Sequence, residues 1–285
     1  MRTGFVYRQH DPSAADYSDR RVPPPAARPP ATRLLSPRGS ALRLELILLG
    51  VAQRRKAGTE FHNDLLLTPG YTQDNSPAWV QLITTPAQYT SAGEFRATPL
   101  TKRARSLAAA LDVLSDAGLI DYPRAADARG KREGFLLMDE RAASPTDRMT
   151  YRVPTMKEPT VRVPSGFLHH GWVHVLEDSE IALLLMVACG RGTLPDPEGW
   201  IAIPAGERLL NYGLSRDAFS AAHPVLKEMG LLEVQSIRRH SDGQVIDFST
   251  EGPSLHRLRI VPDGFEQNAY DCAHEALERL NSPRN

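Results

Sequence analysis

The stretch LTKRARSLAAALDVLSDAGLIDY, residues 100–122, carries the strongest structural signal in this 285-residue sequence. Its apolar residues recur at the i, i+3, i+4 and i+7 spacing of an amphipathic helix. They are Leu107, Ala110, Leu111 and Leu114. Upstream, Thr98 is a suitable N-cap residue and Pro99 a suitable first helical residue. Gly118 is suited to end the helix, and the residues that follow, Leu119–Tyr122, predict a short strand.

The same pattern returns 112 residues later in LSRDAFSAAHPVLKEMGLLEV, residues 214–234. At this shift Gly230 falls on Gly118, and an apolar Leu-Leu pair again follows the glycine. The other matched positions are Phe219 with Leu107, Ala222 with Ala110, and Leu226 with Leu114. A pattern that recurs with its internal spacing intact predicts two domains of one kind.

The sequence around the two copies predicts further elements in a similar order. In the second copy these are a helix (178–188), a strand (199–203), a short helix (204–213), a hairpin built on Asp242–Gly243 (236–248) and a strand (255–261). In the first copy they are a helix (41–58) capped by Ser40, two strand-like pieces (61–67 and 78–84) and a strand (135–138).

The order helix, strand, helix, tight turn, helix, strand, loop, strand resembles the winged helix-turn-helix family. The resemblance covers residues 40–140 and 165–262 and implies an α+β fold with two such domains in tandem. In the second copy Gly213 lets the chain turn between two helices and Ser215 caps the next. The first copy departs from the pattern, because about 24 extra residues separate its first helix from its glycine.

Tandem winged helices of this kind resemble those of plasmid-type replication initiators and of some bacterial regulators. The segments 163–190 and 203–219 are also similar to uncharacterised helix-turn-helix proteins of high-GC bacteria. The resemblance therefore implies sequence-specific binding of double-stranded DNA. The role would be transcriptional regulation or replication initiation on a mobile element such as a plasmid.

In this family the third helix enters the major groove of DNA, and a helix amino end favours anions. In the first copy, phosphate contacts are expected from Arg96, Lys102, Arg124, Arg129, Lys131 and Arg132, and base contacts from Arg103, Arg105 and Ser106. In the second copy the candidates are Ser215, Arg216 and Ser220, with Arg238 and Arg239 in the wing. Asp217 would repel phosphate, so the first copy is expected to be the main DNA reader.

Two other interpretations stay open. Cations at the start of residues 99–116 also occur on ordinary solvated helices. Winged helices also act as protein-interaction modules, so the chain could be a non-catalytic adaptor that scaffolds a protein complex. The charge distribution is relevant to this alternative: residues 1–160 hold 23 Lys and Arg against 17 Asp and Glu, whereas residues 161–285 hold 11 against 17. A protein partner would therefore bind through the acidic second half.

The segments outside the two copies complete the predicted organisation. Residues 1–39 contain seven prolines and seven arginines and predict a disordered basic tail. Residues 141–164 are expected to be a linker. Residues 263–285 predict a C-terminal amphipathic helix whose apolar stripe is Tyr270, Ala273, Leu277 and Leu280. This helix either packs back on the second domain or pairs with a second subunit in a homodimer.

Composition and motifs exclude several classes of protein. The chain is 41% hydrophobic and 24% charged and has no apolar run of the roughly 18 residues that a membrane span requires. Its start is polar and its two cysteines form no disulfide framework, which predicts a cytoplasmic location. It lacks the phosphate-loop, G-x-G-x-x-G and G-x-S-x-G motifs, and nothing completes a metal site around HHGWVH (169–174). We therefore expect no enzymatic activity, cofactor or metal.

Overall fold

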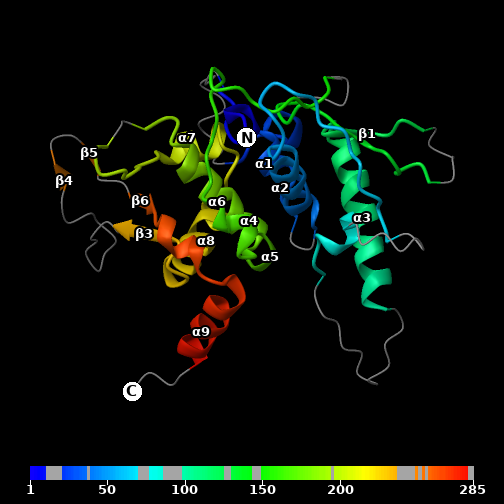
Figure 1. Cartoon of the computed structure of the whole chain (residues 1–285). Helices are drawn as coiled ribbons and strands as arrows, with labels where there is room; N and C mark the ends of the chain where they lie inside the picture. Colours follow the sequence, from blue (N-terminus) through cyan, green and yellow to red (C-terminus); the bar gives the residue numbers. More distant parts are fainter. Residues whose placement is uncertain are drawn as a thin grey trace. The chain divides into compact units, whose positions relative to one another are not determined.

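The computed structural model confirms the α+β class, with helices and short antiparallel strand pairs. It describes residues 1–10, 21–36, 39–69, 77–85, 98–124, 130–142, 149–193, 196–235, 248–249, 252–253 and 256–281. The chain forms two compact units (Figure 1). Unit 1 is Met1–Phe5 with Arg33–Thr160, and unit 2 is Val6–Thr32 with Val161–Asn285. The polypeptide therefore passes from one unit to the other three times.

Unit 1 is built on two helices, α2 (Ala41–Ala52) and α3 (Pro99–Asp116), which pack against each other. The side of α3 that faces α2 carries the apolar residues that the periodicity identified, all of them buried. α2 begins directly after Ser40, as predicted, and is buried around most of its circumference. It is therefore the central helix of this unit's core.

A short 3-10 helix, η3 (Trp79–Gln81), also packs on α3, where a strand had been expected. The Gln81 side chain accepts a hydrogen bond from the Ala78 backbone N–H at 2.8 Å, which favours the turn over an extended chain. Trp79 is fully buried and donates its Nε1–H to Asn63 Oδ1 at 2.8 Å. The indole is thus a core residue of unit 1.

Four extended segments form the sheet of unit 1. β1 (Ile120–Asp121) pairs antiparallel with β2 (Leu136–Leu137). Bridges from Met138 to Thr150 and from Arg152 to Glu60 continue the pairing. Tyr151 in the third segment is fully buried. The predicted linker at 141–164 is therefore wrong for its described residues up to Thr160, which belong to unit 1 because their backbone completes this sheet.

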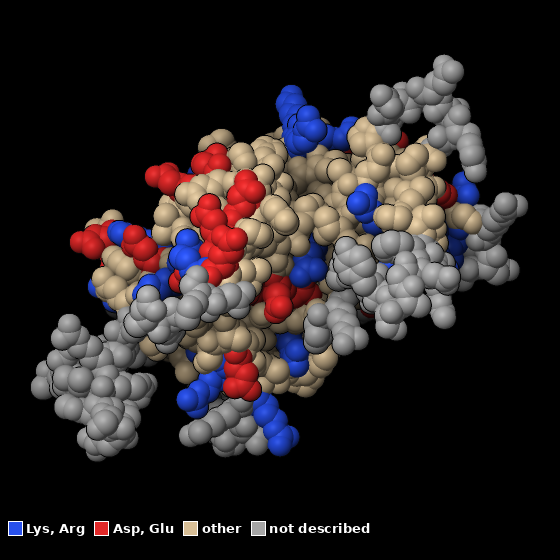
Figure 2. All heavy atoms as spheres, turned by 90° about the horizontal axis from the view of Figure 1, so that it is seen from below, with Lys and Arg blue, Asp and Glu red and all other residues tan. Residues whose placement is uncertain are grey.

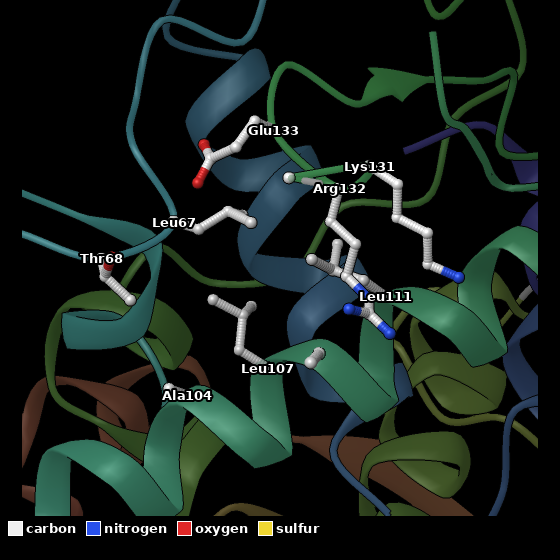
Figure 3. Close-up of a pocket in the computed structure, with 10 residues that line it drawn as sticks. Leu67, Thr68, Ala104, Leu107, Leu111, Lys131, Arg132 and Glu133 are labelled. Atoms are coloured by element: carbon white, nitrogen blue, oxygen red, sulfur yellow. The ribbon is translucent and has the colours of Figure 1, made fainter. Parts of the chain in front are cut away.

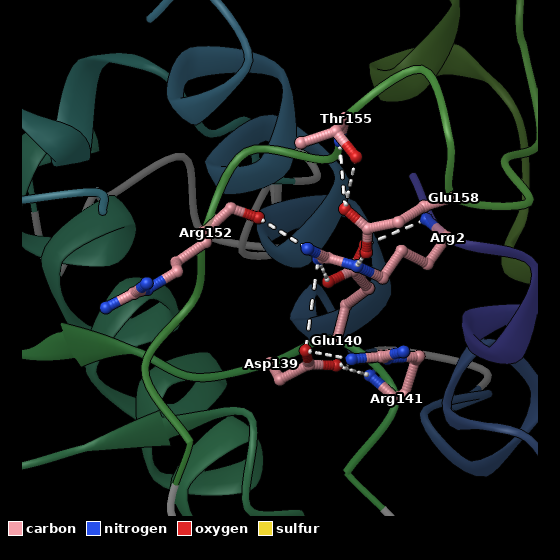
Figure 4. A network of polar contacts seen from close by, with 7 residues as sticks. All are labelled: Arg2, Asp139, Glu140, Arg141, Arg152, Thr155 and Glu158. Atoms are coloured by element: carbon pink, nitrogen blue, oxygen red, sulfur yellow. Dashed lines mark hydrogen bonds and ion pairs between the residues drawn. The ribbon is translucent and has the colours of Figure 1, made fainter. Parts of the chain in front are cut away.

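The first residues of the chain also belong to unit 1 (Figure 4). The backbone N–H and the Nη1 of Arg2 both donate to the Glu140 carboxylate at 2.8 Å. Arg2 also donates to Glu158 through Nε and to the Arg152 carbonyl through Nη2. The Arg2 and Glu140 side chains are 6% and 0% exposed. Such a buried charge pair is tolerated because each group finds several hydrogen-bonding partners.

The described residues of Val6–Thr32, which we call the arm, pack within unit 2 around the segment Asn211–Tyr212. The Arg8 backbone N–H donates to the Asn211 carbonyl at 2.9 Å, and the Thr32 hydroxyl donates to the Tyr212 carbonyl at 2.7 Å. The predicted disordered tail at 1–39 is therefore wrong for its described residues. Phe5, Val6, Ala31 and Leu34 are buried. The backbone N–H groups of Thr3 and Arg8 donate to Pro159 and Asn211, which are far away in the sequence.

The core of unit 2 is formed by α6 (Asp178–Cys189) against α8 (Arg216–Glu228), with α7 (Ala205–Leu210) between them in sequence. β3 (Leu232–Gln235) pairs antiparallel with β6 (Arg257–Ile260), and Ile201 forms a bridge with Leu258 of β6. Between β3 and β6 in the sequence, β4 (Phe248–Ser249) pairs with β5 (Gly252–Pro253). The predicted turn at Asp242–Gly243 lies outside the described residues.

The predicted C-terminal helix is present as α9 (Ala269–Asn281). It packs on unit 2 through buried Ala269 and Ala276, and Arg279 Nε donates to Glu228 of α8 at 2.9 Å. Tyr270 and Leu277 stay 70% and 58% exposed. The helix thus packs back on its own domain; pairing with a second subunit stays a prediction.

Short elements complete the described chain. They are η1 (Thr3–Phe5), η2 (Pro25–Ala27), α1 (Pro30–Arg33), α4 (Gly166–His169), α5 (Trp172–Val175) and η4 (Pro262–Glu266). In the ranges that the structure describes, no helix has both the length and the apolar character that crossing a bilayer requires.

Candidate nucleic-acid interface

The two helices that carry the sequence repeat, α3 and α8, end in the same way. The backbone N–H of Leu119 donates to the Leu114 carbonyl at 2.9 Å, and that of Leu231 donates to the Leu226 carbonyl at 3.0 Å. The preceding glycines have left-handed φ angles, 75° at Gly118 and 71° at Gly230. This is the hydrogen-bonded helix end that glycine favours, and it lies at the same place in both copies of the repeat.

The buried faces of α3 and α8 also correspond at the 112-residue shift. Leu107 and Phe219 are 2% and 9% exposed, and Leu114 and Leu226 are both fully buried. Leu119 and Leu231, which precede β1 and β3, are buried as well. The repeat detected in the sequence is therefore equivalent in its backbone hydrogen bonds at the helix end and in these core positions, although Leu111 is buried and its counterpart His223 is half-buried.

The two helices begin differently. α3 has 18 residues and starts after Thr98, whose hydroxyl accepts from the Thr101 N–H at 3.1 Å. α8 has 13 residues and starts after Ser215, whose hydroxyl accepts from the Ala218 N–H at 3.2 Å. In the repeat register Ser215 falls on Arg103. The additional five residues of α3 therefore extend its amino end beyond the point where α8 begins.

The first two turns of α3 carry three of the predicted DNA-binding cations. Arg105 is exposed, and Lys102 and Arg103 are half-buried. Within the described part of the chain, neither Arg103 nor Arg105 forms an ion pair with an acidic residue. Ser106, in contrast, lies 3.0 Å from the Ser40 hydroxyl, oxygen to oxygen, so it is engaged with the start of α2. The two arginines retain their charge for a ligand, and Ser106 is the weaker candidate.

The cations of the loop between β1 and β2 are already paired. Arg132 binds Asp112 of α3 through Nε at 3.0 Å and Nη2 at 2.6 Å, and Lys131 Nζ lies 3.9 Å from the same carboxylate. The Tyr122 hydroxyl also donates to Asp112 at 3.0 Å. The Arg132 hydrogen bonds hold the pKa of Asp112 below its ordinary value. Arg132 and Lys131 thus anchor this loop to α3, which reduces the charge they can offer to phosphate.

A groove of about 340 Å³ runs along α3 beside this loop (Figure 3). Its apolar floor includes Leu67, Leu107 and Leu111. Lys131 and Glu133 stand on its loop side. The groove therefore lies on the face of α3 that carries Leu107 and Leu111, whereas Arg105 points to another, solvent-exposed side of the helix.

The remaining predicted residues divide into three groups. In unit 2, Arg216 and Ser220 are exposed on α8, whereas the Ser215 hydroxyl is occupied as the helix cap. In unit 1, Arg124 is exposed and reaches the Gly130 carbonyl at 3.4 Å. The third group lies outside the described residues: Arg96, Arg129, Arg238 and Arg239.

Two arginines at the turn before α8 were not identified from the sequence. Arg208 of α7 stacks its guanidinium over the Phe219 ring at 4.7 Å and donates its Nε–H to the Leu214 carbonyl at 3.3 Å. Arg28 of the arm lies against Gly213. Their spacing to α8 in sequence has no helical or strand period, so no local pattern could have identified them.

Searches against family models, curated proteins and solved structures found no match. Among the described residues, no three His, Cys, Asp or Glu side chains come together in a way that could hold a metal ion. Function must therefore be inferred from the geometry of α3, α8 and their surroundings.

Proposed function

We propose that this chain is a non-catalytic, double-stranded DNA-binding protein made of two winged helix-turn-helix units, and that α3 is its main DNA-reading helix. The order of elements in unit 2 supports the winged-helix assignment: α6, the Ile201 bridge, α7, α8, β3 and β6 follow one another. Ile201 and β3 flank β6 on its two sides. In unit 1, α2, α3, β1 and β2 follow a similar order, with the 3-10 helix η3, and no α-helix among the described residues, in the place of α7.

One observation carries the proposal: the amino end of α3 projects two arginines that have no acidic partner among the described residues. Thr98, Pro99, Leu100 and Thr101 are all exposed at this end, as is Arg105. An α-helix with its side chains is about 10–12 Å across, which matches a major groove about 12 Å wide. The end of α3 therefore combines the shape, the exposure and the charge that duplex DNA requires.

In this proposal the residues of α3 divide between backbone and base contacts. Lys102 would contact phosphate, and Arg103 and Arg105 would reach base edges, where arginine binds guanine through two parallel hydrogen bonds. Ala109 and Val113 continue the exposed side beyond Arg105, and Val113 is 46% exposed. Transcriptional regulation and replication initiation on a mobile element are both compatible with such a reader.

The test is selection of a preferred duplex from a random library, followed by titration at two salt concentrations. We expect wild-type affinity to fall steeply as salt rises, because phosphate contacts release counterions. Replacing Arg103 and Arg105 by alanine should abolish preference for the selected site. Arg55→Ala is the matched control, because Arg55 is an exposed cation that is already paired with Asp64. Failure of the wild type to retain any duplex at low salt would reject the proposal.

A winged-helix adaptor is the second candidate, and the charge of unit 2 favours it. Acidic side chains gather over unit 2 on the face drawn in Figure 2, and the paired state of Arg132 and Lys131 removes cations that a DNA reader would use. An adaptor would bind a basic protein surface. Normal folding of the wild type without duplex binding at low salt would favour this function.

A further inference from the structure

Three arginines from three segments converge on the turn between α7 and α8. Arg28 comes from the arm: a Cβ placed on Gly213 would lie 3.1 Å from the Arg28 Cγ. Arg208 comes from α7 and donates its Nε–H to the Leu214 carbonyl at 3.3 Å. Arg216 is the first residue of α8. Each of the three thus contacts or belongs to residues 213–216, although 188 positions separate Arg28 from Arg216 in the sequence.

None of these three arginines forms an ion pair with an acid in the described ranges. Arg28 donates its Nε–H to the Pro23 carbonyl at 2.6 Å, a neutral partner. Arg208 is half-buried against Phe219, again without a counter-charge. Burial lowers the pKa of Arg28, and burial together with the nearby charge of Arg216 lowers the pKa of Arg208.

Other arginines of the chain, in contrast, are paired with a carboxylate. Hydrogen bonds to Asp112 raise the pKa of Arg132, and hydrogen bonds to Asp139 raise the pKa of Arg141. In each of those cases a carboxylate supplies the missing negative charge. At the α7–α8 turn, the acid on α7, Glu207, is engaged by the Asn211 side chain at 2.8 Å.

Arg28 and Arg208 are half-buried and Arg216 is exposed. Cations that are partly desolvated and have no counter-charge favour the binding of an anion. Guanidinium groups match the geometry of phosphate with paired N–H donors. The Phe219 ring and the Leu214 carbonyl also hold Arg208 in place, so less side-chain freedom would be lost on binding. Two carboxylates oppose an anion here: Asp217, which is exposed on α8, and Glu207, which adjoins Arg208 on α7.

We propose that Arg28, Arg208 and Arg216 form a phosphate-binding site for the DNA backbone at the α7–α8 turn of unit 2. This inference rests on the proposed function and extends it, because it makes the arm a part of the DNA-binding surface. It also changes the role of unit 2, whose third helix alone carries few cations. Unit 2 would hold the backbone while α3 of unit 1 reads bases.

The experiment compares the salt dependence of duplex binding in two double variants. In Arg28→Ala/Arg216→Ala two unpaired cations are removed. In Arg257→Ala/Arg259→Ala the same charge is removed from arginines that are paired with Asp196 and Glu233. A labelled duplex of random sequence is titrated between about 50 and 200 mM salt, where each lost phosphate contact lowers the slope of log K against log salt by about 0.9. We expect the slope to fall by about 2 in the first variant and to stay unchanged in the second.

Two further measurements test whether the variants fold and whether the bound anion is phosphate. Melting temperatures verify that both variants fold, and Arg208→Lys, which keeps the charge but loses the paired donors, should weaken binding without unfolding unit 2. Inorganic phosphate should raise the melting temperature of the wild type more than chloride of equal ionic strength, and this difference should disappear in Arg28→Ala/Arg216→Ala.

The possible failures are distinguishable. An unchanged salt slope in Arg28→Ala/Arg216→Ala, with site preference still lost in the Arg103 and Arg105 variants, overturns this site and leaves the proposed function standing. Stabilisation by phosphate without any change in slope means that free phosphate, and not the DNA backbone, is the ligand, which also overturns the proposal. If the wild type binds no duplex at all, the proposed function and this extension of it both fail.

Discussion

From Leu107 to Ile120, α3 and its exit follow the same course as α8 and its exit from Phe219 to Leu232. The left-handed glycine, the closing hydrogen bonds and the buried pairs Leu107/Phe219, Ala110/Ala222 and Leu114/Leu226 correspond. Two buried positions of unit 1, Leu111 and Gly118, have counterparts in His223 and Gly230 that are not buried. Before this stretch the helices diverge, because α3 continues five residues further at its amino end. The carboxy-terminal part of each helix, which contributes to the core, therefore corresponds in the two units, whereas the amino ends differ.

The outward side itself differs in one instructive position. In the 112-residue register Ala109 corresponds to Ala221 and Val113 to Val225, so these positions carry the same residues. One turn earlier, however, Arg105 corresponds to Asp217, and both are exposed. The two helices thus keep their size and apolar character along this side and differ in charge where a DNA reader would need a cation. This difference is the reason for assigning base reading to unit 1.

The largest effect on stability is expected from truncating the buried leucine that the two helices share. Leu114→Ala and Leu226→Ala each remove a fully buried side chain and should each lower the free energy of unfolding by about 3 kcal/mol. Urea denaturation followed by amide hydrogen exchange would assign each loss to its unit. If one substitution cost less than about 1 kcal/mol, a value far below the usual range for buried leucine, the two helices would not have equivalent cores.

A smaller and again equal effect is expected at the shared glycines. Alanine at Gly118 or Gly230 would have to adopt a left-handed backbone, which costs about 1–2 kcal/mol. Asparagine tolerates this conformation better, so Gly118→Asn and Gly230→Asn should cost less than the alanine variants. Thermal unfolding of the four variants provides the comparison. Equal stability of the alanine and asparagine variants would mean that backbone conformation does not set the cost.

The repeated helix end could be predicted from the sequence because its determinants are local. The spacing of Leu107, Ala110 and Leu114 and the position of Gly118 lie within a dozen residues. The same holds for α9, whose presence was predicted although its bounds and its buried face were not. Its apolar stripe pointed to Tyr270 and Leu277, but the alanines Ala269 and Ala276 are buried because small side chains allow close packing on unit 2.

The arm and the network around Arg2 could not be predicted because their partners are distant in the sequence. Arg2 and Glu140 are 138 positions apart, and Thr32 and Tyr212 are 180 apart. A proline-rich, apolar-poor stretch gives a local signal of disorder. Here hydrogen bonds and a few buried side chains outweigh that signal. The pairing of Arg132 with Asp112 was missed for the same reason, since composition shows a cation but not its partner.

The pairing of Arg132 with Asp112 is expected to have the smallest effect on stability, and it is the most specific difference between the units. Asp112 corresponds in the repeat register to Pro224 of α8, so unit 2 has no carboxylate at this place. The pKa of Asp112 is lowered in the folded chain, chiefly by its hydrogen bonds from Arg132. A carboxylate with a lowered folded pKa stabilises the fold above its unfolded pKa, and the contribution is lost as the pH falls through the folded pKa. Unit 1 should therefore lose this contribution only below about pH 4.

Asp112→Asn isolates the contribution. The Asp112 side chain is 42% exposed, so solvent screening should limit the loss at neutral pH to less than about 1 kcal/mol. Below about pH 4 the difference in stability between the wild type and the variant should shrink, while unit 2 should respond equally in both, since its α8 has Pro224 in this position. The variant also frees Arg132 and Lys131, so its duplex binding should become steeper with salt if the loop between β1 and β2 lies beside DNA. An acid-unfolding profile for unit 1 that is parallel in the two proteins would show that Asp112 does not anchor this loop, and the contrast between α3 and α8 would then be confined to their amino ends.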